Sequence, residues 1–294
     1  MYKYYKKNEY NVMHYRFDSI NEFTEYLTVT PIKKDIFKKP DSIFGSYSFC
    51  KTKNFDEAIN LLKYGYHEDF DKLIKLKLTL EKYIKLSNKK NRQYNFYVGY
   101  APDVKAYLEG SPLSMINKDI NLRKKIDVYI NSGYSCGTSA NAIFNRGAII
   151  LMLIEILESL GFNVDLHLFI MAIEDNDIHF SNFLFKKENE RLNPQKLYFP
   201  LCHPSWARRL YFRLVEQTPD ITESWVTGYG VPCNLKTIEK IIDLKKNDII
   251  IPTIEEINIK GNDIIDDANS LFNYINSLSE KDFELEPIQK IRRL

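Results

Sequence analysis

The first 90 residues place hydrophobic positions at helical spacing among polar ones, which predicts a helical N-terminal region over 1–90. Capping-box patterns start two helices in it, at Ser19 and at Asn54, and Gly65 stands where the second helix needs its C-terminal cap. A longer helix is predicted over 69–86, where apolar residues are set among lysines. We therefore expect helices alone in this part of the chain.

After the polar segment 87–92 the pattern changes to apolar strands that alternate with helices. Strands are predicted over 94–99, 126–131, 163–172, 180–185 and 247–254, and helices over 102–110, 140–160, 204–216 and 266–278. This alternation predicts an α/β domain over 91–294, a three-layer fold whose mainly parallel sheet has helices on both faces. Strands 126–131 and 163–172 are expected side by side and parallel, joined by helix 140–160, and 180–185 is expected to form a hairpin with the second.

The helix predicted over 140–160 is apolar nearly all round, so we expect other elements to cover it on both sides. Gly147 in its middle lowers helix propensity by about 1 kcal/mol, which indicates close packing against a neighbouring backbone. Arg146 and Glu155 place charges on this apolar helix, and buried charges need partners. Their pairing is expected to be structural.

Composition is that of an ordinary globular protein, with 44% hydrophobic and 27% charged residues among 294. The net charge of +2 gives no global field toward nucleic acid, so nucleic acid is not an expected partner. The first ten residues hold no apolar signal sequence, and the longest apolar run, 148–154, is far below the ~20 residues that span a bilayer. We expect a cytoplasmic protein without a membrane partner.

The turn 131–139, with the sequence NSGYSCGTS, follows a predicted parallel strand at the end where such sheets bind ligands. Its small residues let the chain turn tightly into the next helix, with Ser139 or Thr138 as the cap. The segment 133–137 also matches G-x-S-x-G in the strand–turn–helix context of a nucleophile elbow. A serine hydrolase with Ser135 as nucleophile is therefore the alternative hypothesis.

The positions of the histidines argue against that alternative. A nucleophile elbow takes its base from a histidine late in the chain, but His203 is the last one and 204–294 contains none. No HGGG-type oxyanion segment precedes the turn. Cys136, where a helix dipole favours a thiolate, is a further candidate nucleophile, although no spacing links it to a histidine.

Four scattered cysteines without a C-x-x-C pair predict neither a disulfide framework nor a zinc ribbon. A zinc site built from Cys136, Cys202, His203 and Cys233 is disfavoured, because the adjacent Cys202 and His203 lack the usual chelating separation. The cysteines are expected to be reduced.

Three arginines lie within a few helical turns of one another in the segment HPSWARRLYFRLVE, residues 203–216. Arg209 and Arg213 are four residues apart on one helix face, so Arg208, Arg209 and Arg213 are candidates for binding an anion or an acidic partner. The alternative is a solvated basic face opposite an apolar side. This interpretation is favoured, because charge clusters on helices usually face solvent.

The order of strand, small-residue turn, long helix, second strand and hairpin resembles a von Willebrand A-type domain, a Rossmann-like fold. In that family an acid and two hydroxyl residues on the turn, with residues from later loops, hold a magnesium ion that binds a partner's carboxylate. The matching positions are Asn131, Gly133 and Ser135. Only Ser135 matches, so a degenerate site without metal or cofactor is expected, and Asn131 and Ser135 are weak candidates for Mg²⁺.

Longer stretches resemble a family of uncharacterised proteins, largely encoded by bacteriophages, that shares this A-type core. They are FCKTKNFDEAINLLKYGY, PDVKAYLEGSPLSM, NRGAIILMLIEILESLGFNVDL and HPSWARRLYFRLVE, spanning about 49–216. The resemblance implies a fold and a phage origin, and no activity. The expected role is non-enzymatic protein–protein interaction or scaffolding in the host cytoplasm, through the turn residues Asn131, Gly133, Ser135, Thr138 and Ser139.

Overall fold

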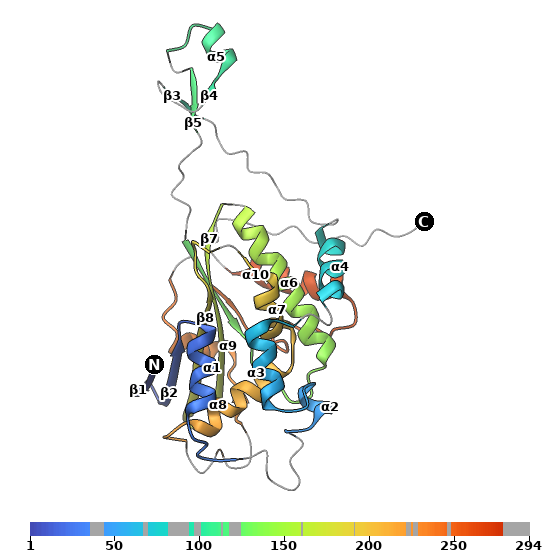
Figure 1. Ribbon diagram of the computed structural model, residues 1–294. Coiled ribbons are helices and arrows are strands. Elements are labelled where there is room, and N and C mark those ends of the chain that lie inside the picture. Colours follow the sequence, from blue (N-terminus) through green and yellow to red (C-terminus); the bar gives the residue numbers. More distant parts are fainter. Residues whose placement is uncertain are drawn as a thin grey trace.

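Two β-sheets and a set of helices make up the computed structural model (Figure 1). The structure describes residues 1–35, 44–66, 70–81, 94–96, 101–112, 114–117, 125–159, 161–190, 192–221, 225, 229–245 and 248–278. The segment 87–92, where we place a domain boundary, lies outside these residues, as do the ends of the predicted helix 69–86 and residues 97–99 of the predicted strand 94–99.

The large sheet has seven strands in the order β1-β2-β8-β7-β6-β10, with β9 beside β7. Their bounds are β1 Tyr2–Lys7, β2 Tyr10–Phe17, β6 Lys125–Asn131, β7 Asn163–Glu174, β8 Asp177–Lys186, β9 Val231–Pro232 and β10 Ile249–Ile251. β6 runs parallel to β7 and β10, and β2 parallel to β8, whereas β1–β2, β7–β8 and β7–β9 are antiparallel. The α/β class is confirmed, the sheet is mixed, and β6 and β7 are parallel neighbours as predicted.

The N-terminal hairpin of β1 and β2 belongs to this large sheet, because β2 pairs with β8. The expectation of helices alone over 1–90 is therefore wrong for residues 2–17. The reason is visible in the segments YKYYKK and YNVMHYRF, which are rich in aromatic residues that favour strands, with Asn8 at a φ of 55° in the turn between them. The N-terminal part of the chain thus shares a sheet with residues 125 onward.

The described helices include the three predicted near the N-terminus, and two of their caps are confirmed. Ser19 Oγ accepts a hydrogen bond from the Glu22 N–H at 3.1 Å, and Asn54 Oδ1 accepts one from the Glu57 N–H at 2.8 Å. The helices are α1 Ile20–Val29, α2 Tyr47–Cys50, α3 Phe55–Tyr64, α4 Phe70–Glu81, α5 Val104–Leu108, α6 Ala140–Ser159, α7 Pro194–Cys202, α8 Phe212–Gln217, α9 Leu235–Ile241 and α10 Ile264–Ser277, with a π-helix η1 at Trp206–Tyr211.

A second, three-stranded sheet forms in the order β3-β5-β4, from Tyr94–Phe96, Met115–Asn117 and Ala101–Pro102. The short helix α5 lies between β4 and β5 in the chain, and Asp103 caps it by accepting from the Ala106 N–H. The helix predicted over 102–110 is therefore present, with Asp103 as its cap in place of Pro102 as its first residue.

Helix α6 is the centre of the main core. It joins β6 to β7 and packs against α7 and α10, and its neighbours bury it along most of its length. A Cβ on Gly147 would lie 2.3 Å from Cys202 Sγ and 2.7 Å from the Leu201 carbonyl oxygen, so the predicted close packing at this glycine is confirmed. By length and composition α6 passes as a membrane span, but 83% of its apolar window is buried inside the fold, as in a core helix of a globular protein.

The two faces of the large sheet are covered differently. Ile126, Val128 and Ile130 of β6 face the main core with α6, whereas Phe169 and Met171 of β7 belong to a separate apolar cluster with α9. In Figure 1, α3, α6 and α7 lie along the same side of the sheet. The face opposite α6 thus carries α9 over one end of its strands.

Candidate functional site

The turn after β6 contains small residues because neighbouring segments of the protein leave little space there. Asn131 Oδ1 accepts a hydrogen bond from the Gly133 N–H at 3.0 Å. A Cβ on Gly133 would lie 3.1 Å from that same oxygen and 3.4 Å from Ile170 Cγ2, so only glycine fits without a shift. Ser139 Oγ then accepts from the Ala142 N–H at 3.1 Å and caps α6, which confirms one of the two predicted caps. The turn is a tight entry to the helix.

Glu255, in the loop after β10, binds the groups that the turn presents. Its carboxylate accepts hydrogen bonds from the Ser135 N–H at 3.0 Å and from Thr138 Oγ1, while Ser135 Oγ lies 3.2 Å from Thr138 Oγ1. Half-burial raises the pKa of Glu255, but the hydrogen bonds from Thr138 and the Ser135 N–H outweigh it and hold this pKa below its ordinary value of 4.5. A carboxylate from a distant loop is therefore the partner of the Ser135 N–H and of the Thr138 hydroxyl.

Arg146 lies beneath the turn and ties two strand ends together. It is 4% exposed, and its guanidinium donates to the carbonyl oxygens of Asn131 at 2.6 Å and Pro252 at 2.7 Å. Burial lowers the pKa of Arg146 to about 10, against the attraction of the nearby Glu255 carboxylate. A fixed positive charge next to the turn disfavours a magnesium ion there, because a cation of that kind depends on ligand charge.

The three arginines of the η1–α8 helix do not form the solvated basic face that we expect. Arg208 and Arg209 are each 6% exposed. Arg208 donates to the carbonyls of Phe49, Cys136 and Thr138 at 3.0, 3.3 and 2.7 Å, and so joins α2 to the turn.

Arg209 and Arg213 are also held within the chain. Arg209 donates to the hydroxyl and carbonyl oxygens of Thr52 at 2.9 and 3.0 Å, and Arg213 lies 3.4 Å from Glu216 and over the Phe55 ring. The physical reason is the π-helix at 206–211, which changes the side-chain spacing from that of an α-helix and turns adjacent arginines toward residues 44–55. The guanidinium groups of Arg208 and Arg209 bind the protein's own carbonyls, and that of Arg213 lies against the protein's own carboxylate of Glu216.

A cavity of ≈ 330 Å³ lies beside the turn, between β7, β9 and the η1–α8 helix. Its walls are mainly apolar and carry six aromatic rings, those of Phe44, Phe49, Tyr134, Tyr211, Phe212 and Tyr229. The Phe212 and Tyr229 rings stack with centroids 3.7 Å apart, and the Arg208 guanidinium lies 4.4 Å from the Phe49 ring centroid. The volume falls at the lower end of the ~300–1,000 Å³ typical of small-ligand pockets.

Two polar groups in the cavity wall, a hydroxyl and a carboxylate, are relevant to the kind of ligand that the cavity can bind. Tyr211 is 3% exposed, and its hydroxyl has no hydrogen-bond partner among the described residues. Glu174, at the end of β7, adds a carboxylate to the lining. A buried hydroxyl without a partner costs about 1–3 kcal/mol, so a ligand that bonds it gains accordingly.

The cysteines of the candidate zinc set lie in three different parts of the fold, and His203 directly follows Cys202 in the chain. His203 stacks on Phe199, its Nδ1 accepts from the Ser205 N–H at 3.2 Å, and burial lowers its pKa to about 4. Cys202 is buried in the main core and Cys233 in the cluster under α9, while Cys136 is exposed at the turn. These residues do not form the disfavoured zinc set.

Several residues that shape this region gave no distinctive signal in the sequence. Glu255 lies 120 residues from Ser135 in the chain, and a lone glutamate in a loop is an ordinary surface residue. Asp127 and Asp165 of a polar group elsewhere on the sheet were missed as well, and its third member, His167, is singled out by the sequence only as a possible base for Cys136. Their signal is an interruption of two apolar strands at alternate positions, in KIDVYIN and NVDLHLF.

The chain belongs to the family described as Domain of unknown function (DUF7192), whose model matches residues 4–278. No curated protein and no solved structure matches the chain. The family match runs from within β1 to the end of α10, so it includes the N-terminal hairpin and the rest of the large sheet together.

Proposed function

We propose that this protein is a non-enzymatic binding protein, whose cavity beside the turn receives an aromatic side chain of a protein partner. The observation that carries the proposal is the apolar cavity of ≈ 330 Å³ at the carboxyl end of β6, the end at which sheets of this class bind ligands. Aromatic anchors that fill such pockets supply much of the binding energy of many protein interfaces. The six aromatic rings in the wall can make edge and face contacts with an aromatic ring that enters the cavity.

The rim of the cavity fits a protein partner. Val231 is 64% exposed and lies in the lining, next to exposed Ser135 and Cys136. An apolar rim continues the apolar contact outward from a buried anchor, as interface cores do. The unpaired hydroxyl of Tyr211 supplies a hydrogen bond for a tryptophan N–H or a tyrosine hydroxyl at the bottom.

The geometry around Ser135 favours binding over hydrolysis. In the part of the chain that the structure describes, no hydrogen bond joins Ser135 to a histidine, and its Oγ approaches Thr138 instead. His203, the base named for the alternative, is hydrogen-bonded to the Ser205 N–H. A serine without a base in reach is a weak nucleophile. The Ser135 N–H and the Thr138 hydroxyl are hydrogen-bonded to Glu255.

We further propose that the fold is a three-layer relative of the von Willebrand A-type domains, of bacteriophage origin and with a degenerate metal site. The support is the parallel β6–α6–β7 unit followed by the β7–β8 hairpin, with helices on one face and α9 on the other. In this proposal Asn131, Gly133 and Ser135 occupy the motif positions, and the Glu255 carboxylate accepts hydrogen bonds from the Ser135 N–H and the Thr138 hydroxyl in place of a metal at the turn.

A displayed library of random dodecapeptides tests the binding proposal. Selection on the wild-type protein is expected to enrich peptides with a common tryptophan, tyrosine or phenylalanine. Val231→Asp places a charge at the rim and is expected to weaken these peptides at least tenfold, whereas Val104→Asp, also at a 64% exposed valine but on α5, leaves their affinity unchanged. Peptides without an aromatic anchor, or equal effects of the two substitutions, would contradict the proposal.

A further inference from the structure

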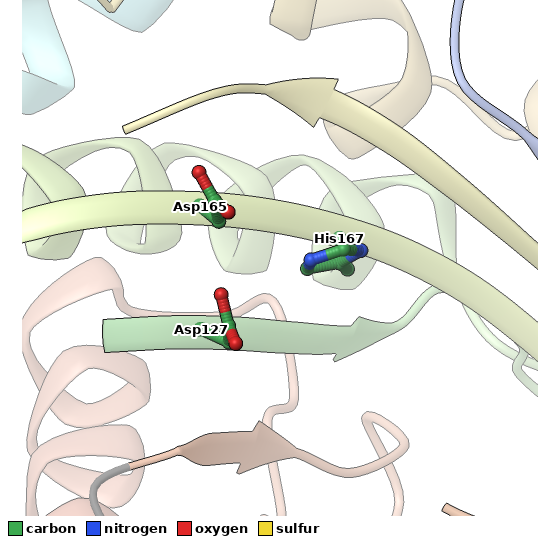
Figure 2. A group of neighbouring side chains, drawn as sticks. All are labelled: Asp127, Asp165 and His167. Carbon is green, nitrogen blue, oxygen red and sulfur yellow. The ribbon is translucent and has the colours of Figure 1, made fainter. Parts of the chain in front are cut away.

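A second group of polar side chains lies on the face of the large sheet opposite α6, toward the amino ends of β6 and β7 (Figure 2). Figure 2 shows Asp127 on β6 and Asp165 and His167 on β7, with α6 behind the strands. One ligand atom from each residue lies within 4.8 Å of the other two. None of these residues lines the cavity beside the turn.

The strand register places two like charges directly opposite each other. Asp127 pairs with Asp165 in the parallel β6–β7 ladder. Like charges at directly opposed positions destabilise a sheet, so this pair calls for a cation. His167, two residues after Asp165, projects from the same side of β7.

Two atoms of the group are buried and lack hydrogen bonds. The Asp127 side chain is 9% exposed, and its Oδ1 has no hydrogen-bond partner among the described residues. The same holds for Nδ1 of His167. An oxygen and a nitrogen of this kind are suited to share one ion.

Two lysines supply positive charge to the group from its rim. Lys125 Nζ lies 2.7 Å from Asp165 Oδ2 and 3.9 Å from Asp127 Oδ1, and Lys245 Nζ lies 3.6 Å from Asp127 Oδ2. The other oxygen of Asp165 accepts from the Glu188 N–H. The Lys125 and Lys245 side chains are 45% and 77% exposed, so each can swing into solvent when another cation arrives.

We propose that Asp127, Asp165 and His167 form a binding site for a divalent transition-metal ion, Zn²⁺ or Mn²⁺, which displaces the Lys125 ammonium. Two carboxylates and an imidazole match these ions, whereas Mg²⁺ prefers oxygen ligands alone. Ligands at about 2.1 Å from the ion lie about 3–4 Å from one another, so small side-chain rotations close the present arrangement. Three protein ligands leave a position for water or for a partner's group.

Titration calorimetry with Zn²⁺, and visible absorption with Co²⁺ as the spectroscopic probe, test this site independently of the cavity. Both are done on the full chain with Cys136→Ser, which removes the exposed thiol. We expect one ion per chain, a loss of affinity of at least tenfold in Asp127→Asn and in His167→Gln, and tighter binding in Lys125→Ala, where the competing ammonium is gone. Circular dichroism confirms that each variant is folded. Asp165→Asn, at a more exposed carboxylate, is an additional variant in which we expect the same loss of metal affinity.

Three results would overturn the proposal. The first is no binding by either the parent protein or Lys125→Ala. The second is binding that survives Asp127→Asn and Asp165→Asn, since the ion then lies elsewhere. The third is weaker binding in Lys125→Ala than in the parent, which would mean that Lys125 belongs to the arrangement as its permanent counterion.

Discussion

The two ends of β6 differ in how their polar groups are hydrogen-bonded. At the carboxyl end, Asn131 Oδ1 holds the Gly133 N–H, Glu255 holds the Ser135 N–H and Thr138, and the open volume beside them is apolar. Toward the amino end, Asp127 projects from the same face of the strand as Asn131, yet its Oδ1 is buried and has no hydrogen-bond partner among the described residues. The carboxyl end uses its polar groups to shape a turn, whereas at the amino end Asp127 and Asp165 are paired with the exposed ammonium groups of Lys245 and Lys125.

This difference separates what each end can recognise. A turn whose N–H and hydroxyl groups are already bonded contributes shape, so in our proposal recognition there depends on apolar contact in the cavity. Asp127 Oδ1 and His167 Nδ1 are buried and have no hydrogen-bond partner among the described residues, and because leaving such atoms unbonded is costly, they are the atoms that our proposed ion would bind. The predictions below test this contrast, starting with the largest expected effect.

Removing Arg208 is expected to damage the carboxyl end most. Arg208→Met leaves three carbonyl oxygens without their charged donor, and hydrogen bonds to charged groups contribute about 1.5–3 kcal/mol each. We expect urea unfolding to show a loss of about 3 kcal/mol. Arg16→Met is the control, because the Arg16 side chain is 59% exposed in a surface ion pair and should cost below about 1 kcal/mol. Equal losses in the two variants would remove the structural role assigned to Arg208.

Asn131 and Asp127 give a direct comparison of the two ends on one strand. Asn131→Ala removes the acceptor of the Gly133 N–H and should cost about 1–2 kcal/mol of unfolding free energy. Asp127→Asn keeps the shape and removes a charge whose Oδ1 has no hydrogen bond, so we expect a change within about 0.5 kcal/mol in metal-free buffer. Chemical unfolding of both variants measures this. A large loss in Asp127→Asn would show that its lysine contacts are strongly stabilising.

Glu255 predicts a dependence of stability on acid. Its pKa in the folded protein is below the ordinary 4.5, so it stabilises the fold at neutral pH, and this contribution is lost as pH falls below 4.5 and through the folded pKa. Because the group is only half-buried, we expect the contribution to be below about 1 kcal/mol. Melting temperatures between pH 7 and pH 3 should fall less steeply for Glu255→Gln than for the wild type. Parallel curves for the two proteins would contradict the bonding of Glu255 to the turn.

The smallest effect is expected at Ser135. Its Oγ is exposed and lies 3.2 Å from Thr138 Oγ1, so Ser135→Ala should change stability by less than about 0.5 kcal/mol. We also expect that a fluorophosphonate probe does not label the wild type at this residue, because among the described residues no histidine is hydrogen-bonded to it as a base. Labelling that disappears in Ser135→Ala would establish the hydrolase alternative.

The sequence predicts the elements around β6 well because their patterns are local. A run of apolar residues, a turn of small residues and an all-round apolar helix identify β6, the turn and α6, and Gly147 correctly indicates the close approach of α7. The N-terminal hairpin is missed because lysines and tyrosines in YKYYKK conceal a two-residue period, and its partner β8 lies more than 150 residues away.

The candidate site is predicted only in part, since its partners come from distant segments. The sequence correctly places the turn at the carboxyl end of a central strand. It does not indicate that Glu255 bonds the turn, because the two segments lie 120 residues apart in the chain. It also does not indicate that Arg208 is buried, because a π-helix at 206–211 replaces the α-helical spacing from which a solvent-facing arginine is inferred. The pairing of Asp127 with Asp165 likewise depends on strand register, which periodicity alone does not fix.

The claim that the cavity accepts an aromatic group is tested most directly with an environment-sensitive naphthalene dye attached to Cys136. Cys136 is exposed at the cavity, whereas Cys50, Cys202 and Cys233 are buried, so labelling is selective. The reference is the same dye on Val104→Cys in a Cys136→Ser background, far from the cavity lining. We predict emission at shorter wavelength from Cys136 than from the reference, reversed by a selected aromatic peptide. Identical emission from the two positions, unaffected by peptide, would contradict the account.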